Sequence, residues 1–342
     1  MRLLQLYFQL RARDSGSIPR FFGQTLRGGL MDVLRRLVCV ARRNECADCL
    51  LKLQCPYCRL MEPFAPPDSA LSRRYATLPR PFVIKVPFDM HSCKRVKGHT
   101  ATMPRRREVM RGDVLRCGIV LLDVTAHFAP YIIYAMEQFC SRGLGGGRIK
   151  FTLERVDAVA RDGRKRKVYE AGRSTVSIGD DVLIPITTLC SAPEGNLRTV
   201  TVRFATPVRL DLDGKLVFPI TFHALIRGII QRLHALQAVY YSDERFDVAF
   251  GMVTPSELLE LARSVSACDD NQLWIDLERY SSRQKTRLKM GGAIGSVTFA
   301  STDACQSLSP FMPLLKLATW LHVGKLTAMG LGELEVVAHN TT

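Results

Sequence analysis

Residues 310–336 read PFMPLLKLATWLHVGKLTAMGLGELEV, an apolar helix pattern followed by a glycine-punctuated loop at 322–332 and a strand. The same order occurs earlier, where a helix pattern at 127–140 leads into RGLGGGR at 142–148 and then into a strand. Two such units, each closing one half of the chain, predict a duplicated domain. Glycine has no side chain, so the backbone N–H groups of such loops can approach a phosphate closely.

The rest of the chain fits two copies of one order of strands and helices. Residues 1–13 alternate apolar and polar side chains, as a half-buried strand does, and a helix pattern follows at 20–43. The further strand and helix patterns lie at 81–86, 114–124, 127–140, 148–158, 200–210, 221–240, 273–280 and 291–299. Each half approximates β-α-β-β-α-β, the ferredoxin-like order. We therefore predict an α+β fold of tandem ferredoxin-like (RRM-like) domains at 1–190 and 197–342, with glycine-rich loops and a cysteine-rich insertion at about 44–67.

The charge balance indicates a polyanionic partner. The 342 residues include 48 Lys and Arg against 32 Asp and Glu, a net charge of +16. Such an excess strengthens binding to phosphate backbones through release of counterions, although it also fits a merely solvated basic surface. Together with the glycine loops it favours nucleic acid over a membrane surface as the partner.

The same composition bears on the compartment. The sequence contains no run of 18 apolar residues, so no membrane span is expected. The alternating pattern of the first strand does not resemble a signal peptide. Eleven cysteines without a secretion signal argue against a disulfide scaffold. These features predict a protein of the reducing cytoplasm.

Four cysteines form two CxxC pairs, Cys46-x2-Cys49 and Cys55-x2-Cys58. Each pair places two thiolates within reach of one tetrahedral ion, so the spacing predicts a structural zinc site. An iron–sulfur cluster and free thiols are the alternatives. Four sulfur ligands leave no open coordination position, so this metal would hold the insertion against the first helix and take no part in chemistry.

Several segments, in order along the chain, carry a resemblance to a known family. They are PRFFGQTLRG at 19–28, the cysteine cluster at 46–58, RPFV at 80–83, GLG at 143–145 before Arg148, RYSSRQ at 279–284, GGAIG at 291–295, LHVGK at 321–325 and GLG at 330–332. The chain thereby resembles the CRISPR-associated endoribonucleases of the RAMP superfamily, which process precursor CRISPR RNA. The resemblance implies metal-independent cleavage within the repeat RNA, with 2′,3′-cyclic phosphate and 5′-hydroxyl ends. It also implies CRISPR repeat RNA as the partner, and subunits of a CRISPR effector complex as further candidates.

One feature departs from that family. Many members carry a catalytic His in or just after the first helix, and the helix pattern at 20–43 contains none. Either the catalytic residue lies elsewhere, or the protein binds RNA without cutting it.

Attack by an internal 2′-hydroxyl needs a base, an acid and a cation that stabilises the phosphate, and His and Lys can fill these roles. Of the seven His, His322 is the first candidate, because it lies where the last helix meets the glycine loop, near Lys325. The alternative is that it only caps the helix. His223, one turn from Arg227 on a predicted helix, is the second candidate, although the pattern favours a plain surface face of the helix over an active pair.

Predicted RNA contacts lie mainly in the basic segment before Gly291-Gly292, where arginines can pair with phosphates and a tyrosine can stack on a base. A solvated strand edge is the alternative. The full set of predicted RNA-binding residues is Arg279, Tyr280, Arg283, Gln284, Lys285, Arg287, Gly324, Gly330, Gly332, Arg142, Arg148 and Arg27.

These observations favour an RNA-cutting enzyme. A non-catalytic CRISPR RNA-binding subunit and a zinc-dependent nucleic-acid-binding regulator are the alternatives. The sequence shows no Walker A motif, no carboxylate-rich metal site and no nucleophile elbow, which argues against NTPases and classical hydrolases.

Overall fold

The computed structural model describes residues 1–41, 46–65, 69–75, 77–96, 98–173, 175–190, 196–242, 250, 253–281, 286–303 and 306–340. The chain divides into two compact units. The first comprises residues 1–87, 105–185 and 235–243, and the second comprises 88–104, 186–234 and 244–342. The units follow the two halves of the sequence apart from the segments 88–104 and 235–243, each of which packs with the other half's unit.

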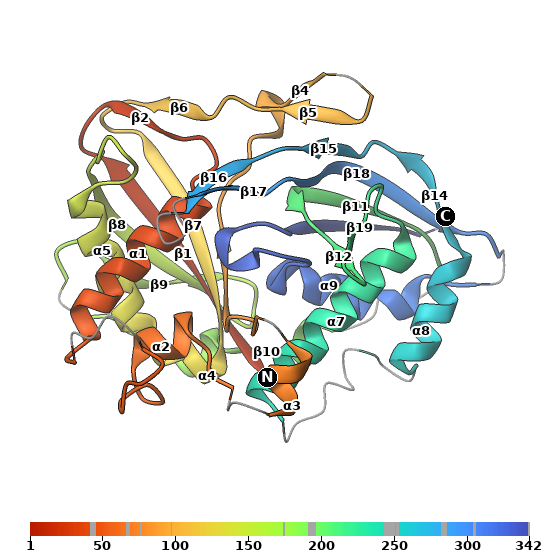
Figure 1. Cartoon of the computed structure of the whole chain (residues 1–342), viewed down its shortest axis with the longest axis horizontal. Helices are drawn as coiled ribbons and strands as arrows, with labels where there is room; N and C mark the ends of the chain where they lie inside the picture. Colours follow the sequence, from red (N-terminus) through yellow and green to blue (C-terminus); the bar gives the residue numbers. More distant parts are fainter. Residues whose placement is uncertain are drawn as a thin grey trace. The chain divides into compact units, whose positions relative to one another are not determined.

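The first unit is built on an antiparallel sheet with the strand order β3-β7-β1-β8-β9 (Figure 1). Its main elements are β1 (Arg2–Ala12), α1 (Gly23–Val38), β3 (Phe82–Lys85), β7 (Val114–Leu122), α5 (Ala129–Arg142), β8 (Phe151–Val159) and β9 (Lys165–Glu170). The order β1-α1-β3-β7-α5-β8 is the predicted β-α-β-β-α-β, and the first strand lies between the third and the fourth. This is a ferredoxin-like domain with β9 added at one edge.

The core of this unit follows from the sequence pattern. Leu4, Leu6, Phe8 and Leu10 of β1 are almost completely buried, as the alternation predicts. Leu3 and Gln5 on the other face are buried as well, so the first half of the strand is covered on both sides. Helices α1 and α5 pack against each other, and Gly29 permits it, because a Cβ at that position would lie 2.0 Å from the Phe139 ring. Gly29 therefore serves the contact between two helices.

Shorter elements surround this sheet. They are β2 (Gly16–Pro19), α2 (Pro56–Met61), α3 (Ala70–Arg74), β6 (Arg106–Val109), α4 (Asp123–Ala126) and β10 (Ile184–Pro185). Strands β2 and β6 form a ribbon of their own. The cysteine-rich insertion is more regular than expected, since its second CxxC lies at the start of α2, which packs on α1.

The second unit repeats the architecture. Its elements are β4 (Lys94–Arg95), β5 (Thr100–Thr102), α6 (Ile186–Leu189), β11 (Leu197–Val208), β12 (Asp211–Leu212), β13 (Lys215–Leu216), α7 (Phe222–Tyr240), α8 (Pro255–Leu261), β14 (Val265–Asp270), β15 (Leu273–Ile275), β16 (Glu278–Ser281), β17 (Thr286–Lys289), β18 (Gly292–Ser301), α9 (Met312–Leu321) and β19 (Leu334–Asn340). The sheet runs β19-β11-β18-β15, with β14 also paired to β18. The first strand again lies between the third and the fourth, so the predicted duplication is confirmed.

Aromatic packing closes the second core. Phe222 at the start of α7 meets Phe299 of β18 edge-to-face at 5.0 Å and Phe311 at 4.9 Å. A capping box begins α8, with Thr254 and Glu257 accepting each other's backbone N–H. The predicted strand 273–280 is divided into β15 and β16. No helix in the described ranges is long and apolar enough to cross a membrane.

Candidate functional site

His322 closes the last helix from inside the protein. It follows α9 as the C-cap residue, with its backbone N–H bonded to Ala318 O, and its side chain is only 1% exposed. Its Nδ1 lies 2.9 Å from Leu331 O, which joins the helix end to the far side of the glycine loop. This geometry favours the capping role over catalysis, because a buried imidazole held by a backbone carbonyl does not reach a phosphate at the surface. The catalytic role of His322 stays a prediction.

The glycines of the C-terminal loop are required by close packing of the backbone. Gly324, Gly330 and Gly332 all have positive φ. A Cβ on Gly332 would lie 2.0 Å from Val323 O, and one on Gly324 would lie 2.4 Å from Arg209 O. The N–H groups of Val323, Lys325 and Gly332 are bonded to carbonyls within the unit. Glycine is thus needed where this loop packs against neighbouring backbone, and that need does not depend on contact with RNA.

This packing predicts the effect of Gly332→Ala. Positive φ costs a residue with a side chain about 1–3 kcal/mol, and the overlap with Val323 O adds to that. The melting temperature should therefore fall by several degrees. Gly146→Ala is the control, because Gly146 is exposed and a Cβ there would meet nothing within 4 Å. Equal melting temperatures for the two variants would contradict this account of the loop.

Lys325 is the exposed cation of the C-terminal loop. Its side chain is 56% exposed, and Nζ lies 2.6 Å from Asp211 Oδ2 in the β12–β13 hairpin. An exposed ion pair contributes little stability and opens readily. Lys325 can therefore exchange Asp211 for a phosphate without a large cost.

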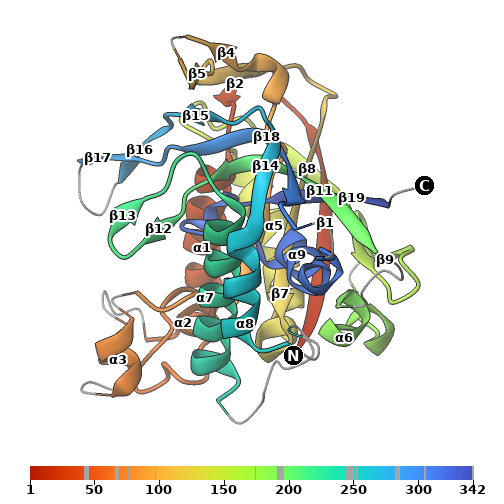
Figure 2. The same cartoon turned by 90° about the vertical axis from the view of Figure 1, so that its right-hand side faces the viewer.

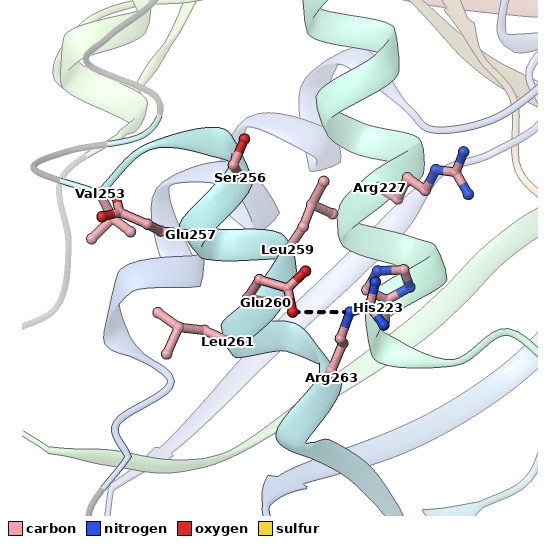
Figure 3. A pocket seen from close by; sticks show the side chains of 9 residues that line it. All are labelled: His223, Arg227, Val253, Ser256, Glu257, Leu259, Glu260, Leu261 and Arg263. Carbon is pink, nitrogen blue, oxygen red and sulfur yellow. Dashed lines mark ion pairs between the residues drawn. The ribbon is translucent and has the colours of Figure 1, made fainter.

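His223 lies in a cavity of about 800 Å³ between the first turn of α7 and α8 (Figure 3). Arg227 and Arg263 also line this cavity, together with Glu260 and apolar side chains of α8. Figure 2 shows α8 beside α7 within the second unit. The predicted pair His223 and Arg227 thus lines one cavity. Glu260 and Arg263 line it as well, and the helical spacing of His223 and Arg227 could not predict this, because these two residues come from a later part of the chain.

Electrostatics suit His223 for proton transfer. Burial, then the positive charges of Arg263 and Arg227, lower the pKa of His223 below its ordinary 6.5, while Glu260 opposes the shift. The imidazole is therefore neutral near pH 7 and can accept a proton. Arg227 is paired with Asp213 at 2.7 Å and Arg263 with Glu260 at 3.3 Å, so both cations are held beside the ring.

The predicted basic segment forms a β-hairpin. Strands β16 and β17 pair with each other, and Arg279 lies opposite Leu288 while Tyr280 lies opposite Arg287. Arg283, Gln284 and Lys285 lie outside the described residues. The backbone thus places Tyr280 and Arg287 at one cross-strand position, and their contact with RNA stays a prediction.

The first glycine loop is more open than the second. Gly143 and Gly145 have positive φ, and Leu144 and Ile149 close the loop with a pair of backbone hydrogen bonds. Gly146 and Gly147 are exposed, as are the predicted contacts Arg142 and Arg148. Arg27, also predicted, lies half-buried on α1. Arg142 and Arg148 are therefore accessible to a polyanion.

The cysteine cluster is partly assembled. The pKa of the Cys58 thiol is raised by burial, with Cys55 and Cys46 close enough to hydrogen-bond to it. Cys49 is joined to Cys46 through a backbone hydrogen bond of 3.2 Å. Within the described ranges, no three His, Cys, Asp or Glu side chains are arranged as a metal site. Three of the four predicted ligands thus lie together, and zinc stays a prediction.

The comparisons with known proteins agree with the duplicated fold and the resemblance. The family CRISPR-associated endoribonuclease Cas6 matches residues 202–334, and a family described as an N-terminal domain matches residues 1–180. The Cas6 match covers less than half of the chain, and it makes the second half of the sequence similar to the CRISPR-associated endoribonucleases. No curated protein matches the sequence.

Two solved structures show the same fold over nearly the whole chain. A Cas6 of Thermus thermophilus, TTHB231, is 15% identical with a TM-score of 0.54 and covers 98% of each chain. A product complex of TTHB231 Cas6 is 16% identical with a TM-score of 0.54 and covers 98% of this chain and 99% of that one. At this identity the likeness concerns the fold alone.

Proposed function

We propose that this protein binds CRISPR repeat RNA and cleaves precursor CRISPR RNA by attack of an internal 2′-hydroxyl. The products are a 2′,3′-cyclic phosphate and a 5′-hydroxyl. The observation that carries the proposal is the match to the Cas6 family in a chain of net charge +16. An internal hydroxyl supplies the nucleophile, so the reaction needs no metal-activated water.

The residues can be assigned to steps of this reaction. His223, neutral near pH 7, takes the proton from the 2′-hydroxyl. Arg227 and Arg263 stabilise the charge that develops on the phosphate. The bond from phosphorus to the 5′-oxygen breaks as the 2′-oxygen attacks, and the leaving 5′-oxygen takes a proton from water. Lys325 grips a neighbouring phosphate after leaving Asp211. We propose His223 and not His322 as the base, because His223 lines a cavity and His322 is buried.

The test is to incubate the protein with repeat RNA in EDTA and to identify both ends of the products. We expect cleavage at one position, a 2′,3′-cyclic phosphate on the 5′ fragment and a 5′-hydroxyl on the other. A 5′-phosphate product, or complete loss of cutting on chelation, would contradict the proposal.

A non-catalytic RNA-binding subunit is the second candidate. Helix α1 (Gly23–Val38) contains no His, and the first His candidate, His322, is buried. If the protein binds repeat RNA tightly and never cuts it under any condition, this reading replaces the first. One of the similar structures is a product complex, and binding of RNA by this chain is part of either proposal. Subunits of a CRISPR effector complex are further proposed partners.

We also propose a structural zinc held by Cys46, Cys49, Cys55 and Cys58. The close approach of Cys58 to Cys46 and Cys55 supports it. Zinc binds thiolates, so loading the site would release thiol protons, including the one that burial retains on Cys58. The metal would fix the first turn of α2 relative to the loop that precedes it.

Metal analysis of protein purified without added metal checks this proposal. We expect about one zinc per chain, as a site of four thiolates requires. Cys49→Ser with Cys55→Ser should remove the zinc and lower the melting temperature, with little change in the cleavage rate of folded protein. Cys268→Ser is the control, because Cys268 is exposed and lies on β14. Protein that contains neither zinc nor iron would refute the site.

A further inference from the structure

A basic pocket lies at one end of the sheet of the first unit, and none of the site residues predicted above lines it. It has a volume of about 470 Å³ and is lined by Arg11, Arg13, Arg111 and Lys150 together with Asp14 and Thr152. These residues come from the end of β1, the turn before β7 and the start of β8. Residues more than a hundred positions apart thus place four cations around one depression.

Three of these cations have no acidic partner among the described residues. Arg11 is neutralised by Glu154, to which its Nε and NH2 groups donate. In the described part of the chain no side-chain partner is found for Arg13, Arg111 or Lys150, and all three side chains are exposed. The one carboxylate in the pocket, Asp14, accepts the backbone N–H of Lys150 at 3.1 Å. The pocket therefore carries a net positive charge that nothing in the described unit cancels.

The backbone beneath these cations is fixed. Arg13 N–H bonds Lys150 O at 2.8 Å, Gly112 N–H bonds Ala12 O at 2.9 Å, and Ala12 N–H bonds Asp113 O at 2.9 Å. Arg111 N–H bonds Ser15 Oγ at 2.9 Å. Cations anchored on a rigid frame lose little backbone freedom on binding a ligand, which favours affinity.

The open glycine loop continues this surface. Lys150 follows Arg148 by two residues, and both are exposed. Gly146 and Gly147 have ordinary φ, and a Cβ on either would have no contact closer than 3.6 Å. Packing therefore does not require glycine at these two positions, whereas close approach of a ligand to the backbone would. Exposed cations that continue from the pocket to Arg148 suit a chain of phosphates better than one isolated ion.

We infer that Arg13, Arg111 and Lys150 form a phosphate-binding pocket for a single-stranded part of the RNA, continuing along the loop at 146–148. No aromatic side chain lines the pocket, so it binds the RNA backbone and does not read bases. The inference rests on the proposed function and extends it to a second contact, within the first unit.

The test compares three variants by their affinity for RNA at several salt concentrations. The first is R13A/R111A/K150A, and the second, R13K/R111K/K150R, keeps every charge. The control, R116A/R164A/K165A, removes three exposed cations elsewhere in the same unit. The probes are repeat RNA with a 2′-deoxy residue before the scissile phosphate and an unrelated RNA of equal length. Cleavage of normal repeat RNA at saturating protein is measured separately.

The first variant should bind both probes roughly tenfold or more weakly at physiological salt, and the salt dependence of its affinity should fall by roughly 0.7 per lost phosphate contact. The charge-retaining variant should bind like the wild type. Both variants should cleave normal repeat RNA at the wild-type rate when the protein is saturating. Unchanged affinity of the first variant, or an equal loss in the control, overturns the inference while the proposed function stands. Failure of the wild-type protein to bind repeat RNA overturns both.

Discussion

Replacing the ribose 2′-hydroxyl on the 5′ side of the scissile phosphate with hydrogen is expected to abolish cleavage. That hydroxyl is the proposed nucleophile, and no other group in the proposed mechanism can take its place. Binding of the RNA should persist, because the proposed phosphate contact of Lys325 does not depend on the missing oxygen. The measurement is single-turnover cleavage of the two substrates at saturating protein, with affinity determined in parallel.

The matched control is a 2′-deoxy residue one position further upstream, which should be cut at close to the normal rate. Both substrates should behave in the same way in EDTA. Cleavage of the first deoxy substrate at the normal site would mean that water is the nucleophile, and the proposed mechanism would then be wrong.

The second large effect is expected for His223→Ala. General acid–base catalysis contributes about 10²–10⁴-fold, so single-turnover cleavage should slow by that factor. Repeat-RNA affinity should change little, because the proton transfer occurs only in the transition state. The lowered pKa of His223 sets the sign of the pH dependence. A base must be neutral, so the wild-type rate should rise with pH through that lowered pKa and level off before about pH 7.

Two other histidines make this test specific. His322→Ala removes the bond to Leu331 O from a buried side chain, so it should lower stability by about 1–3 kcal/mol, with the cleavage rate of folded protein preserved. His339→Ala removes only an exposed hydrogen bond between Nε2 and Thr201 Oγ1, so it should change neither quantity much. If His322→Ala stops cleavage at unchanged stability and His223→Ala does not, the loop histidine is the base after all.

Local sequence patterns were sufficient for the fold. The alternation in β1 and the two helix patterns that became α5 and α9, each followed by a glycine loop and a strand, predicted a duplicated ferredoxin-like architecture. The structure confirms it. Such patterns succeed because burial of one face is repeated every two residues in a strand and every three to four in a helix. The ends of elements were less accurate, as α1 is shorter than the pattern at 20–43.

The candidate site depended more on tertiary structure. The junction of helix and glycine loop drew attention to His322, but sequence position does not reveal whether a side chain points outward or inward, and this one is buried. His223 and Arg227 were paired from helical spacing, whereas Arg263 and Glu260 reach them only because α8 packs beside α7. The basic pocket of the first unit was missed, since Arg13, Arg111 and Lys150 are isolated in the sequence.

Composition, spacing and local periodicity were therefore enough to predict the duplicated α+β architecture, the cysteine pairs, the basic character and the resemblance to the Cas6 family. The packing of the folded chain was needed to show which glycines are held by the backbone, which histidine lines a cavity and which cations have no acidic partner among the described residues. These properties depend on contacts such as Gly332 with Val323, Arg11 with Glu154 and Arg13 with Lys150. The last two of these contacts join residues more than a hundred positions apart, so the local sequence around either residue does not reveal them.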